Sequence, residues 1–463
     1  MSISADSIAV LRQQLTGDSI LTGSEISERY SVDFTGENSQ VPLAVVRPKS
    51  TEEVALVLKI CSEFVQPVVI QGGLTGLAGG ATPLPGEIAM SLERLSGIEE
   101  VDTDSMTVTA MAGAPLQVIQ EAAENAGFLF PLDFGARGSC HIGGAIATNA
   151  GGNQVIRFGM TRNLVLGLEA VLADGTVISS MNKMLKNNAG YDLKQLFIGT
   201  EGTLGVITRA VLRLFPRLSS RCTALCAVES FSQSVRLLRE AQIKLGSSIS
   251  AYEVMWSPYF DRVIGHIETL RSPFEKAFPL YVLIETEGSE QNMDSQQFEE
   301  VLGSALAENF IEDAVIAQSE KDRETFWAIR DGVSEITKAL IPYASLDVSM
   351  DIAEMSGFLE EFDAALSSNL PDALNLVFGH VGDNNLHLFI TTHRQKDIKK
   401  ILDLGYGLTG AHGGSISAEH GIGVLKRDYL HHSRTAEEIE LMRRLKKALD
   451  PKGILNPGRV IPD

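Results

Sequence analysis

The chain has 463 residues, of which 44% are hydrophobic, and a formal net charge of -20 at pH 7. This length and apolar content can bury a large core and suggest two or three globular domains. Nucleic acid and anionic membranes would be repelled by so acidic a surface, so neither is expected as a partner.

Cysteine usage and the N-terminus both favour a reducing, soluble compartment. Cys61, Cys140, Cys222 and Cys226 form no CxxC, so neither a disulfide framework nor a thiolate metal site is expected. The first 15 residues lack a basic n-region and an Arg-rich pattern. No apolar run reaches the roughly 18 residues that a transmembrane helix needs. We therefore expect a cytoplasmic protein.

The residues up to 80 predict a unit of alternating helices and strands that delivers a glycine-rich loop. The predicted elements are an opening helix around 8–15, a strand at 42–47, a helix with a capping box of Ser50 and Glu53, and a buried strand at 67–70. The loop that follows, QGGLTGLAGG at 71–80, stands at a strand end, where α/β folds hold ligands. It fits a pyrophosphate cradle.

The next predicted elements complete a first domain that ends at 215–216. They are a hairpin at 98–101 and 106–111, a helix at 115–126, a hairpin at 164–172 and 177–178, and a buried strand at 203–214. Between them lies 131–152, PLDFGARGSCHIGGAIATNAGG, which holds six glycines in 22 residues. Such glycines let the backbone lie close to a flat ligand, and two such loops suit a dinucleotide. A tight helix crossing is the alternative.

From Arg221 onward, strands and helices alternate and predict an α+β module with a mainly antiparallel sheet. Strands are expected at 222–228, 249–255, 279–285, 313–317 and 345–350, and helices at 231–245, 296–307, 325–339 and 356–366. A last helix is expected after Thr435.

Four residues near the end of the chain predict a metal centre. LNLVFGH at 374–380 and LHLFI at 386–390 flank the turn GDNN, so His380 and His387 should meet at the end of a hairpin. SISAEHGIG at 415–423 adds Glu419 and His420. Two imidazoles and a carboxylate form a three-ligand site with an open position, as in catalytic zinc. The alternative is a hydrogen-bonded polar cluster.

Both glycine segments, together with KNNAGYDLKQLFIGTEGTLGVIT at 186–208, resemble the flavin-binding domain of the vanillyl-alcohol oxidase and p-cresol methylhydroxylase superfamily. The likeness extends to the branch of D-2-hydroxyglutarate dehydrogenase, D-lactate dehydrogenase and the D-subunit of glycolate oxidase. It implies an α+β fold with a two-subdomain FAD-binding domain at 1–217, a substrate (cap) domain at 218–414, and a C-terminal segment at 415–463 that returns to the FAD domain.

The resemblance also implies which residues bind FAD. Leu74 stands where covalently flavinylated relatives commonly carry histidine, so a dissociable FAD is expected. The expected contacts are Gly72, Gly73, Leu74, Thr75, Gly76, Leu77, Gly79, Gly80, Pro131, Gly138, Ser139, Cys140, Gly143, Gly144, Thr148, Asn149, Gly151, Gly152, Glu201, Gly202, Gly205, Ile207 and Asn456.

The family pattern HxGDxxxH and EHG implies a divalent metal, zinc by preference, on His380, His387 and Glu419, with His420 as catalytic base. Arg330 would bind the substrate carboxylate, with a salt bridge to Asp331 as the alternative role. Ser334, Asn385 and Phe389 are the other expected substrate contacts.

The implied activity is FAD-dependent oxidation of a D-2-hydroxy acid to a 2-oxo acid by hydride transfer. The implied partners are an electron acceptor (an electron-transfer flavoprotein, quinone or cytochrome) and a second copy of the chain in a homodimer. Ser345 and Phe389 replace a Lys and an Asn of the hydroxyglutarate enzymes, so a D-2-hydroxy monoacid such as D-lactate is favoured. The alternatives are a non-redox flavin transferase like alkylglycerone phosphate synthase and a flavin subunit of a glycolate oxidase complex.

Overall fold

The computed structural model describes residues 3–392 and 394–462, which form two compact units. Unit 1 comprises the described residues of Met1–Gly152, Phe158–Arg217 and Glu419–Asp463, and unit 2 comprises Asn153–Arg157 and Leu218–Ala418. Two short segments therefore differ from the predicted domains, because 153–157 and 415–418 belong to unit 2. The first is fixed there by Arg157, whose Nη1 donates to the backbone carbonyl of Glu287 at 2.8 Å.

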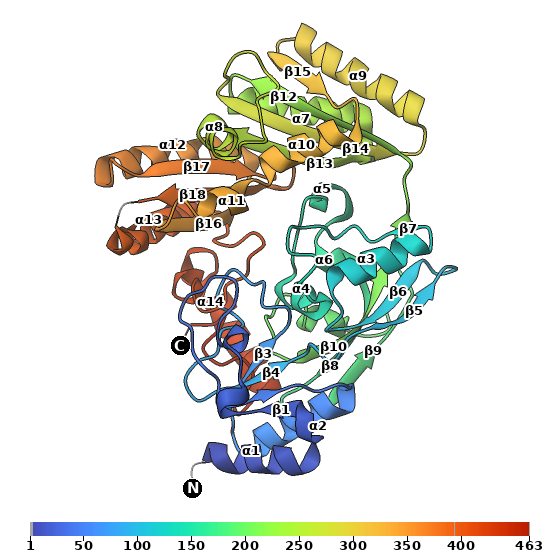
Figure 1. Ribbon diagram of the computed structural model, residues 1–463, viewed down its shortest axis with the longest axis vertical. Helices are drawn as coiled ribbons and strands as arrows, with labels where there is room; N and C mark the ends of the chain where they lie inside the picture. Colours follow the sequence, from blue (N-terminus) through green and yellow to red (C-terminus); the bar gives the residue numbers. More distant parts are fainter. Residues whose placement is uncertain (1–2, 393, 463) are drawn as a thin grey trace. The chain divides into compact units, whose positions relative to one another are not determined.

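The first sheet of unit 1 delivers the glycine loop 72–81 (Figure 1). Its strand order is β1-β2-β4-β3, and β2, β4 and β3 run parallel. Its elements are α1 (Ile3–Gln14), β1 (Ile20–Leu21), β2 (Val45–Val46), α2 (Thr51–Glu63), β3 (Val68–Gln71) and β4 (Ile88–Ser91). The strand predicted at 42–47 is thus only two residues long. The predicted capping box is also incomplete, since the Glu53 carboxylate accepts from the N–H of Lys49.

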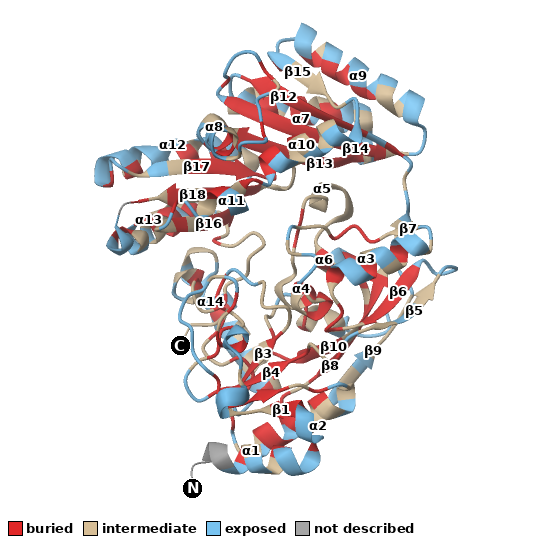
Figure 2. Cartoon of the chain, in the orientation of Figure 1, coloured by how far each residue is buried: buried red, intermediate tan, exposed pale blue. Residues whose placement is uncertain are grey.

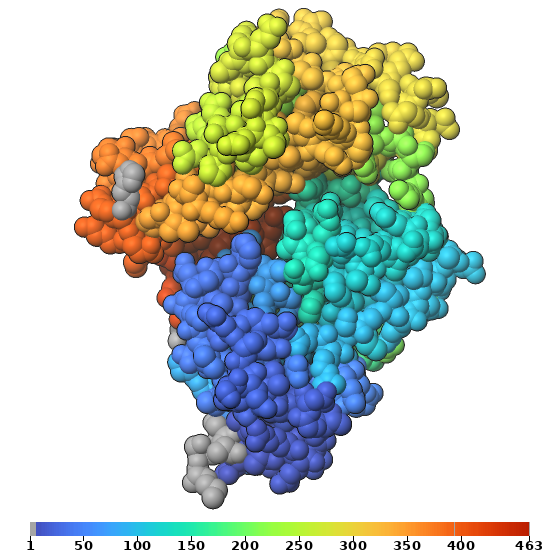
Figure 3. All heavy atoms as spheres, in the orientation of Figure 1, coloured from blue at the N-terminus to red at the C-terminus, as the bar shows by residue number. Residues whose placement is uncertain are grey.

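The second sheet of unit 1 is antiparallel, with the order β5-β6-β10-β8-β9. The strands are β5 (Ile98–Asp102), β6 (Thr107–Met111), β8 (Val165–Val171), β9 (Val177–Ser180) and β10 (Val206–Arg213), and β7 (Phe128–Leu129) pairs separately with β11 (Phe215–Pro216). The helices are α3 (Leu116–Asn125), α4 (Ile142–Thr148), α5 (Val155–Phe158) and α6 (Thr161–Leu164). One apolar core joins both sheets to α2, α3 and α4. On the face shown in Figure 3, the first hundred residues (blue) adjoin the cyan segment that follows them.

The C-terminal tail of unit 1 adds to the first sheet. After α14 (Ala436–Leu449), which begins at a full capping box of Thr435 and Glu438, the tail lies along β3. The N–H of Val68 donates to Ile454, and the N–H of Asn456 donates back to Val68. Residues nearly 400 positions apart in the chain are thereby joined next to the glycine loop.

Unit 2 contains one seven-stranded sheet in which every pairing between named strands is antiparallel, in the order β15-β12-β14-β13-β17-β18-β16. The strands are β12 (Ser220–Val228), β13 (Ile249–Trp256), β14 (Leu280–Gly288), β15 (Asp313–Ile316), β16 (Tyr343–Ser349), β17 (Leu374–Gly379) and β18 (Asn385–Thr391). The helices are α7 (Phe231–Leu245), α8 (Ser257–His266), α9 (Gln291–Ala307), α10 (Glu320–Arg330), α11 (Val333–Thr337), α12 (Ile352–Asn369) and α13 (Ile398–Ala411). The strands are mostly buried, while α9 keeps an exposed outer side (Figure 2).

One helix prediction was wrong, and several helices were not predicted. The helix predicted at 325–339 is two helices, α10 and α11, separated at Gly332, where a Cβ would lie 2.6 Å from Cγ1 of Val263 on α8. Helices α8 and α13 were not predicted, and neither was α4 inside the glycine segment. In α4, two adjacent glycines weaken the helix propensity, and tertiary packing decides the outcome.

Candidate functional site

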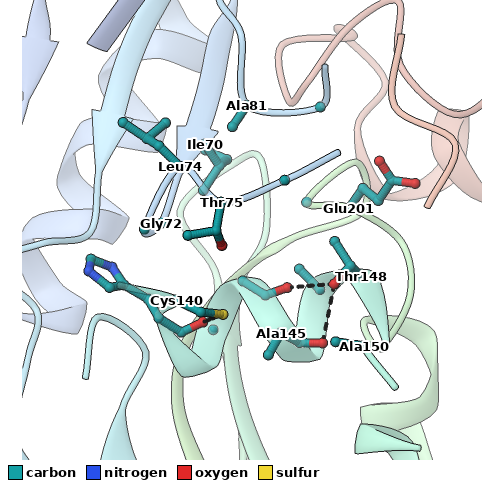
Figure 4. Close-up of a pocket in the computed structure, with 18 of the residues that line it drawn as sticks. Ile70, Gly72, Leu74, Thr75, Ala81, Cys140, Ala145, Thr148, Ala150 and Glu201 are labelled. Carbon is teal, nitrogen blue, oxygen red and sulfur yellow. Dashed lines mark hydrogen bonds between the residues drawn. The ribbon is translucent and has the colours of Figure 1, made fainter. Parts of the chain in front are cut away.

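The glycine segments of unit 1 line one cavity of about 340 Å³ (Figure 4). Eighteen of the predicted FAD contacts are among its lining residues, and they come from the loop 72–80, from 140–152, from 201–207 and from Asn456. Predicted contacts outside the lining are Gly79, Pro131, Gly138, Ser139 and Asn149. Gly79 packs on Leu425 instead, and the Asn149 side chain accepts from the N–H of Arg162 at 2.9 Å.

The cavity wall is built of closely apposed backbone, which is why glycine is needed there. A Cβ on Gly73 would lie 1.9 Å from the carbonyl oxygen of Ser139, so the two glycine segments could not approach each other with a larger residue. Leu74 takes a left-handed conformation with φ of 60°. Such non-glycine residues are strained and occur chiefly where the surrounding structure holds them, as at ligand sites.

Polar side chains of the cavity, among them Cys140, Thr148 and His141, can form hydrogen bonds with a ligand. Burial raises the pKa of the Cys140 thiol to about 11, so this side chain stays protonated. The Thr148 hydroxyl donates within α4, to the carbonyl of Gly144 at 3.1 Å (Figure 4). His141 is buried enough for its pKa to be lowered, and its Nδ1 has no hydrogen-bond partner among the described residues. An unsatisfied buried nitrogen in a cavity wall is a site for a ligand atom.

Glu419 and His420, predicted from the sequence as metal ligand and base, line the same cavity. A Cβ on Gly151 would lie 2.2 Å from Oε1 of Glu419, so a larger residue there would displace this carboxylate from its position. The turn after His420 is held by Glu201, a half-buried cavity residue whose own φ is 51°. Its carboxylate accepts from the N–H groups of Ile422 at 2.7 Å and Gly423 at 2.9 Å. The role of Glu201 visible here is therefore to support this turn.

Residues of the C-terminal tail form hydrogen bonds with the segments that line the cavity. Asn456 accepts from the N–H of Ile70 at 2.8 Å and donates to the carbonyl of Glu201. Arg459 is buried and pairs with Glu87 through both Nη atoms, at 2.6 and 2.8 Å, while its Nε donates to the carbonyl of Gly80 at 2.9 Å. Sequence reasoning did not identify Arg459, because the partners lie more than 370 residues away.

In unit 2, the hairpin of β17 and β18 brings the two predicted metal histidines together. His387 pairs with Phe378, His380 directly follows β17, and the two imidazole centroids are 5.3 Å apart. Each Nδ1 faces a buried carboxylate that the sequence did not reveal. Glu253 Oε1 lies 2.7 Å from His380, and Asp347 Oδ1 lies 3.6 Å from His387. A carboxylate behind each imidazole is typical of metal-ligating histidines.

Arg330 ends α10 beside this pair and is buried. The alternative role, a salt bridge to Asp331, is present as one of its contacts, although Arg330 itself does not lie on the surface. Its Nε donates to Glu253 Oε2 at 2.9 Å, and its Nη1 donates to Asp331 at 3.0 Å. Its Nη2 lies 2.8 Å from His380 Nε2. Burial opposes ionisation of Glu253, but Arg330 and His380 outweigh it and lower the pKa of Glu253 to about 2.

The other predicted substrate contacts differ in placement. Asn385 is buried and its Nδ2 donates to Asp347 at 3.0 Å, while its Oδ1 has no hydrogen-bond partner in the described part of the chain. Phe389 is the cross-strand partner of Ser345 and stacks on Phe378 at 6.0 Å. Ser334 is exposed on α11, and its hydroxyl donates to Glu335. Thus Asn385 and Phe389 lie on the strand that carries His387, and Ser334 makes no described contact with this cluster.

Comparisons with known proteins agree on the family. Residues 42–180 match the family described as "FAD binding domain", and residues 217–460 match "FAD linked oxidases, C-terminal domain". The mitochondrial D-2-hydroxyglutarate dehydrogenase of Arabidopsis thaliana is 37% identical and covers 100% of this chain and 82% of its own. The D-2-hydroxyglutarate dehydrogenase of Xanthomonas citri pv. viticola is 38% identical, with 94% of this chain and 92% of its own covered.

Solved structures agree on the fold. p-Cresol methylhydroxylase with substrate bound superposes with a TM-score of 0.80 at 16% identity, covering 100% of this chain and 97% of its own. Alkyldihydroxyacetonephosphate synthase superposes with a TM-score of 0.75 at 17% identity, covering 98% of this chain and 84% of its own. At these identities the likeness concerns the fold alone.

The expected cytoplasmic location is wrong by these comparisons, because the Arabidopsis and Bos taurus relatives carry "mitochondrial" in their names. Cysteine usage and surface charge could not have separated the two locations, since cytosol and mitochondrial matrix are both reducing and aqueous. No helix of the described residues combines the length and the apolar character needed to cross a membrane.

The glycine-lined cavity, the fold of both units and the relatives at 37–38% identity lead to one conclusion. The chain belongs to the FAD-linked oxidases, in the branch that contains the D-2-hydroxyglutarate dehydrogenases, and it shares its fold with p-cresol methylhydroxylase.

Proposed function

We propose that this protein is an FAD-dependent dehydrogenase that oxidises a D-2-hydroxy acid to the corresponding 2-oxo acid. The observation that carries the proposal is that Glu419 and His420 line the same cavity as the glycine loops. A proton acceptor and a flavin site then share one wall. The names of the matched relatives support the same reaction class.

FAD fits the cavity on three observations: bare backbone at Gly73, the buried Nδ1 of His141 with no partner among the described residues, and a wall of small residues. The residues that would hold it are the lining members of 72–80, 140–152 and 201–207, with Asn456. When bound, FAD supplies a two-electron acceptor for a hydride. No histidine occurs in the loop 71–80, so we propose that the flavin is dissociable.

We propose that His380, His387 and Glu419 hold a divalent metal, and that zinc is the ion. The support is two buried imidazoles 5.3 Å apart, each backed by a carboxylate. Arg330 Nη2 lies at His380 Nε2, so an ion bound at this nitrogen would require that guanidinium group to turn. When bound, the metal supplies Lewis-acid polarisation of the substrate hydroxyl.

The chain's own residues would then do three things. Arg330 would bind the α-carboxylate, because a planar guanidinium matches a carboxylate with two hydrogen bonds. His420 would take the proton from the hydroxyl oxygen as the Cα hydride leaves. The surrounding apolar residues of unit 2, such as Phe378 and Phe389, would keep water from the substrate's side chain.

The substrate class follows from Ser345 and Phe389, which face each other across β16 and β18. The pair offers one hydroxyl and one aromatic ring, whereas a second carboxylate would need a cation or an amide. We therefore propose a D-2-hydroxy acid with a small or apolar side chain, such as D-lactate. D-2-hydroxyglutarate is the second candidate, favoured by the names of the matched relatives.

The test is anaerobic mixing of the purified protein with D-lactate, D-2-hydroxybutyrate and D-2-hydroxyglutarate while the visible flavin band is followed. Bleaching by a D-2-hydroxy acid supports the dehydrogenase, and a transferase would show none.

Chelation and His387→Ala should each abolish turnover with flavin retained. Full activity in a metal-free preparation would contradict the metal proposal. A higher kcat/KM for the glutarate would overturn the substrate class alone. The electron acceptor (flavoprotein, quinone or cytochrome) and the homodimer stay predictions.

A further inference from the structure

Glu253 is a buried carboxylate that touches two proposed site residues at once. It lies on β13 between apolar neighbours and is 1% exposed. Its Oε1 lies 2.7 Å from His380 Nδ1, and its Oε2 accepts from Arg330 Nε at 2.9 Å. One carboxylate therefore bridges the proposed metal ligand and the proposed substrate-binding arginine.

Strand pairing puts Glu253 in this position. Val254 pairs with Gly379 and Met255 with Phe378, so the next residue along each strand sets Glu253 beside His380. Alternation along β13 puts Glu253 on the same face as Met255, which belongs to the apolar cluster under α8 and α10. An ionised carboxylate inside such a cluster is costly unless its oxygens are paired, and here both are.

The two contacts fix the chemistry of both partners. A carboxylate that accepts from Nδ1–H leaves the lone pair of a neutral imidazole on Nε2, which is the form that binds a metal. Binding Arg330 through Nε anchors the guanidinium beside His380. Its Nη2, which lies 2.8 Å from His380 Nε2, is not held by Glu253 and would turn away when an ion takes that nitrogen.

We propose that Glu253 is a positioning residue that sets the tautomer of His380 and anchors Arg330 through its Nε, and so couples metal affinity to substrate carboxylate binding. The inference rests on the proposed function, because it takes His380 as a metal ligand and Arg330 as the carboxylate-binding group. Glu253 itself contacts neither metal nor substrate in this assignment.

The test variant is Glu253→Gln, which keeps the shape but can accept from only one of the two partners with its single oxygen. Glu285→Gln is the matched control. Glu285 is equally buried on the neighbouring strand β14 and accepts from Arg323 at 2.7 Å, Trp327 at 2.9 Å and Thr223 at 2.7 Å. It therefore reports the cost of neutralising a buried, paired glutamate of this sheet without touching His380.

The primary readout is the Kd for Zn²⁺ alone, measured on the metal-stripped full chain by competition with a chromophoric chelator. Loss of a carboxylate partner of a metal-ligating histidine typically weakens binding by about 10- to 100-fold, and we expect that for Glu253→Gln and wild-type affinity for Glu285→Gln. KM for the hydroxy acid should rise as well in the first variant. Glu253→Asp, which keeps the charge, should recover part of the Zn²⁺ affinity, and it serves as the test if the Gln variant does not fold.

Failure of the inference is distinguishable from failure of the proposed function. Equal Zn²⁺ affinity in Glu253→Gln and wild type, with His387→Ala weakened, overturns the role of Glu253 and leaves the metal site intact. Equal loss in Glu253→Gln and Glu285→Gln also overturns it, because the effect would then be general to the sheet. No difference between His387→Ala and wild type overturns the proposed metal site, and the inference with it.

Discussion

Glu201→Gln is expected to slow the oxidation of the hydroxy acid while leaving FAD bound. The carboxylate of Glu201 accepts from two consecutive backbone N–H groups, of Ile422 and Gly423, just beyond His420. Glutamine keeps one acceptor oxygen and turns an NH₂ group toward the other N–H. One of two charge-assisted bonds is lost, and a donor then faces a donor.

The size of the effect follows from these bonds. Hydrogen bonds to charged groups contribute about 1.5 to 3 kcal/mol each, so losing one is enough to displace the turn locally. A misplacement of about 1 Å in a catalytic group can cost on the order of 10²-fold in rate. We therefore expect kcat/KM to fall by about 10- to 100-fold, which corresponds to roughly 1.4 to 2.8 kcal/mol of lost transition-state stabilisation.

The assay is anaerobic flavin bleaching, normalised to bound FAD per chain. The control is Glu169→Gln, a buried glutamate of unit 1, which accepts from Thr51 at 2.7 Å and Thr208 at 3.0 Å and does not line the cavity. It should lose stability with little change in rate. A wild-type rate in FAD-replete Glu201→Gln, or a rate loss that merely follows FAD content, would refute the positioning argument.

Three further outcomes are expected. Acid precipitation of the purified protein should release a yellow chromophore into the supernatant, and colour kept in the pellet would show a covalent link. Gly73→Ala, whose Cβ would lie 1.9 Å from Ser139 O, should lower the ratio of visible to 280 nm absorbance, whereas Gly17→Ala, whose Cβ would have no neighbour within 4 Å and which does not line the cavity, should not. Glu354 and then Glu361 hold the pKa of His412 above its usual 6.5. The contribution of this contact to the free energy of unfolding is therefore complete below about pH 6.5 and is lost as the pH rises through the raised pKa. Urea unfolding of wild type and His412→Asn should give a difference that shrinks toward high pH, and a constant or growing difference would disprove it.

Local patterns determined much of this protein. The turn GDNN between two apolar runs was enough to predict the hairpin that brings His380 and His387 together, because a short turn fixes which residues pair. The helix at 231–245 was predicted with the bounds it has, since its capping box and helical spacing lie within a few residues of one another. The glycine segments predicted a ligand cavity because close backbone approach forbids side chains whatever the rest of the fold does.

Long-range packing decided the rest. Gly332 interrupts a sequence of continuous helical character because Val263 of α8 packs against it, 69 residues earlier in the chain. Glu253 gave one local signal, a charged residue inside an apolar strand, but its partners His380 and Arg330 are 127 and 77 residues away. His380 meets Glu253 only because β17 takes the place beside β13 in the sheet, and Arg330 meets it from the end of α10. The sequence by itself determined which elements form and which chemical groups the chain carries. Which buried charges face one another was decided by the strand order, because non-local pairing depends on the packing of the whole sheet and leaves no periodic mark in the chain.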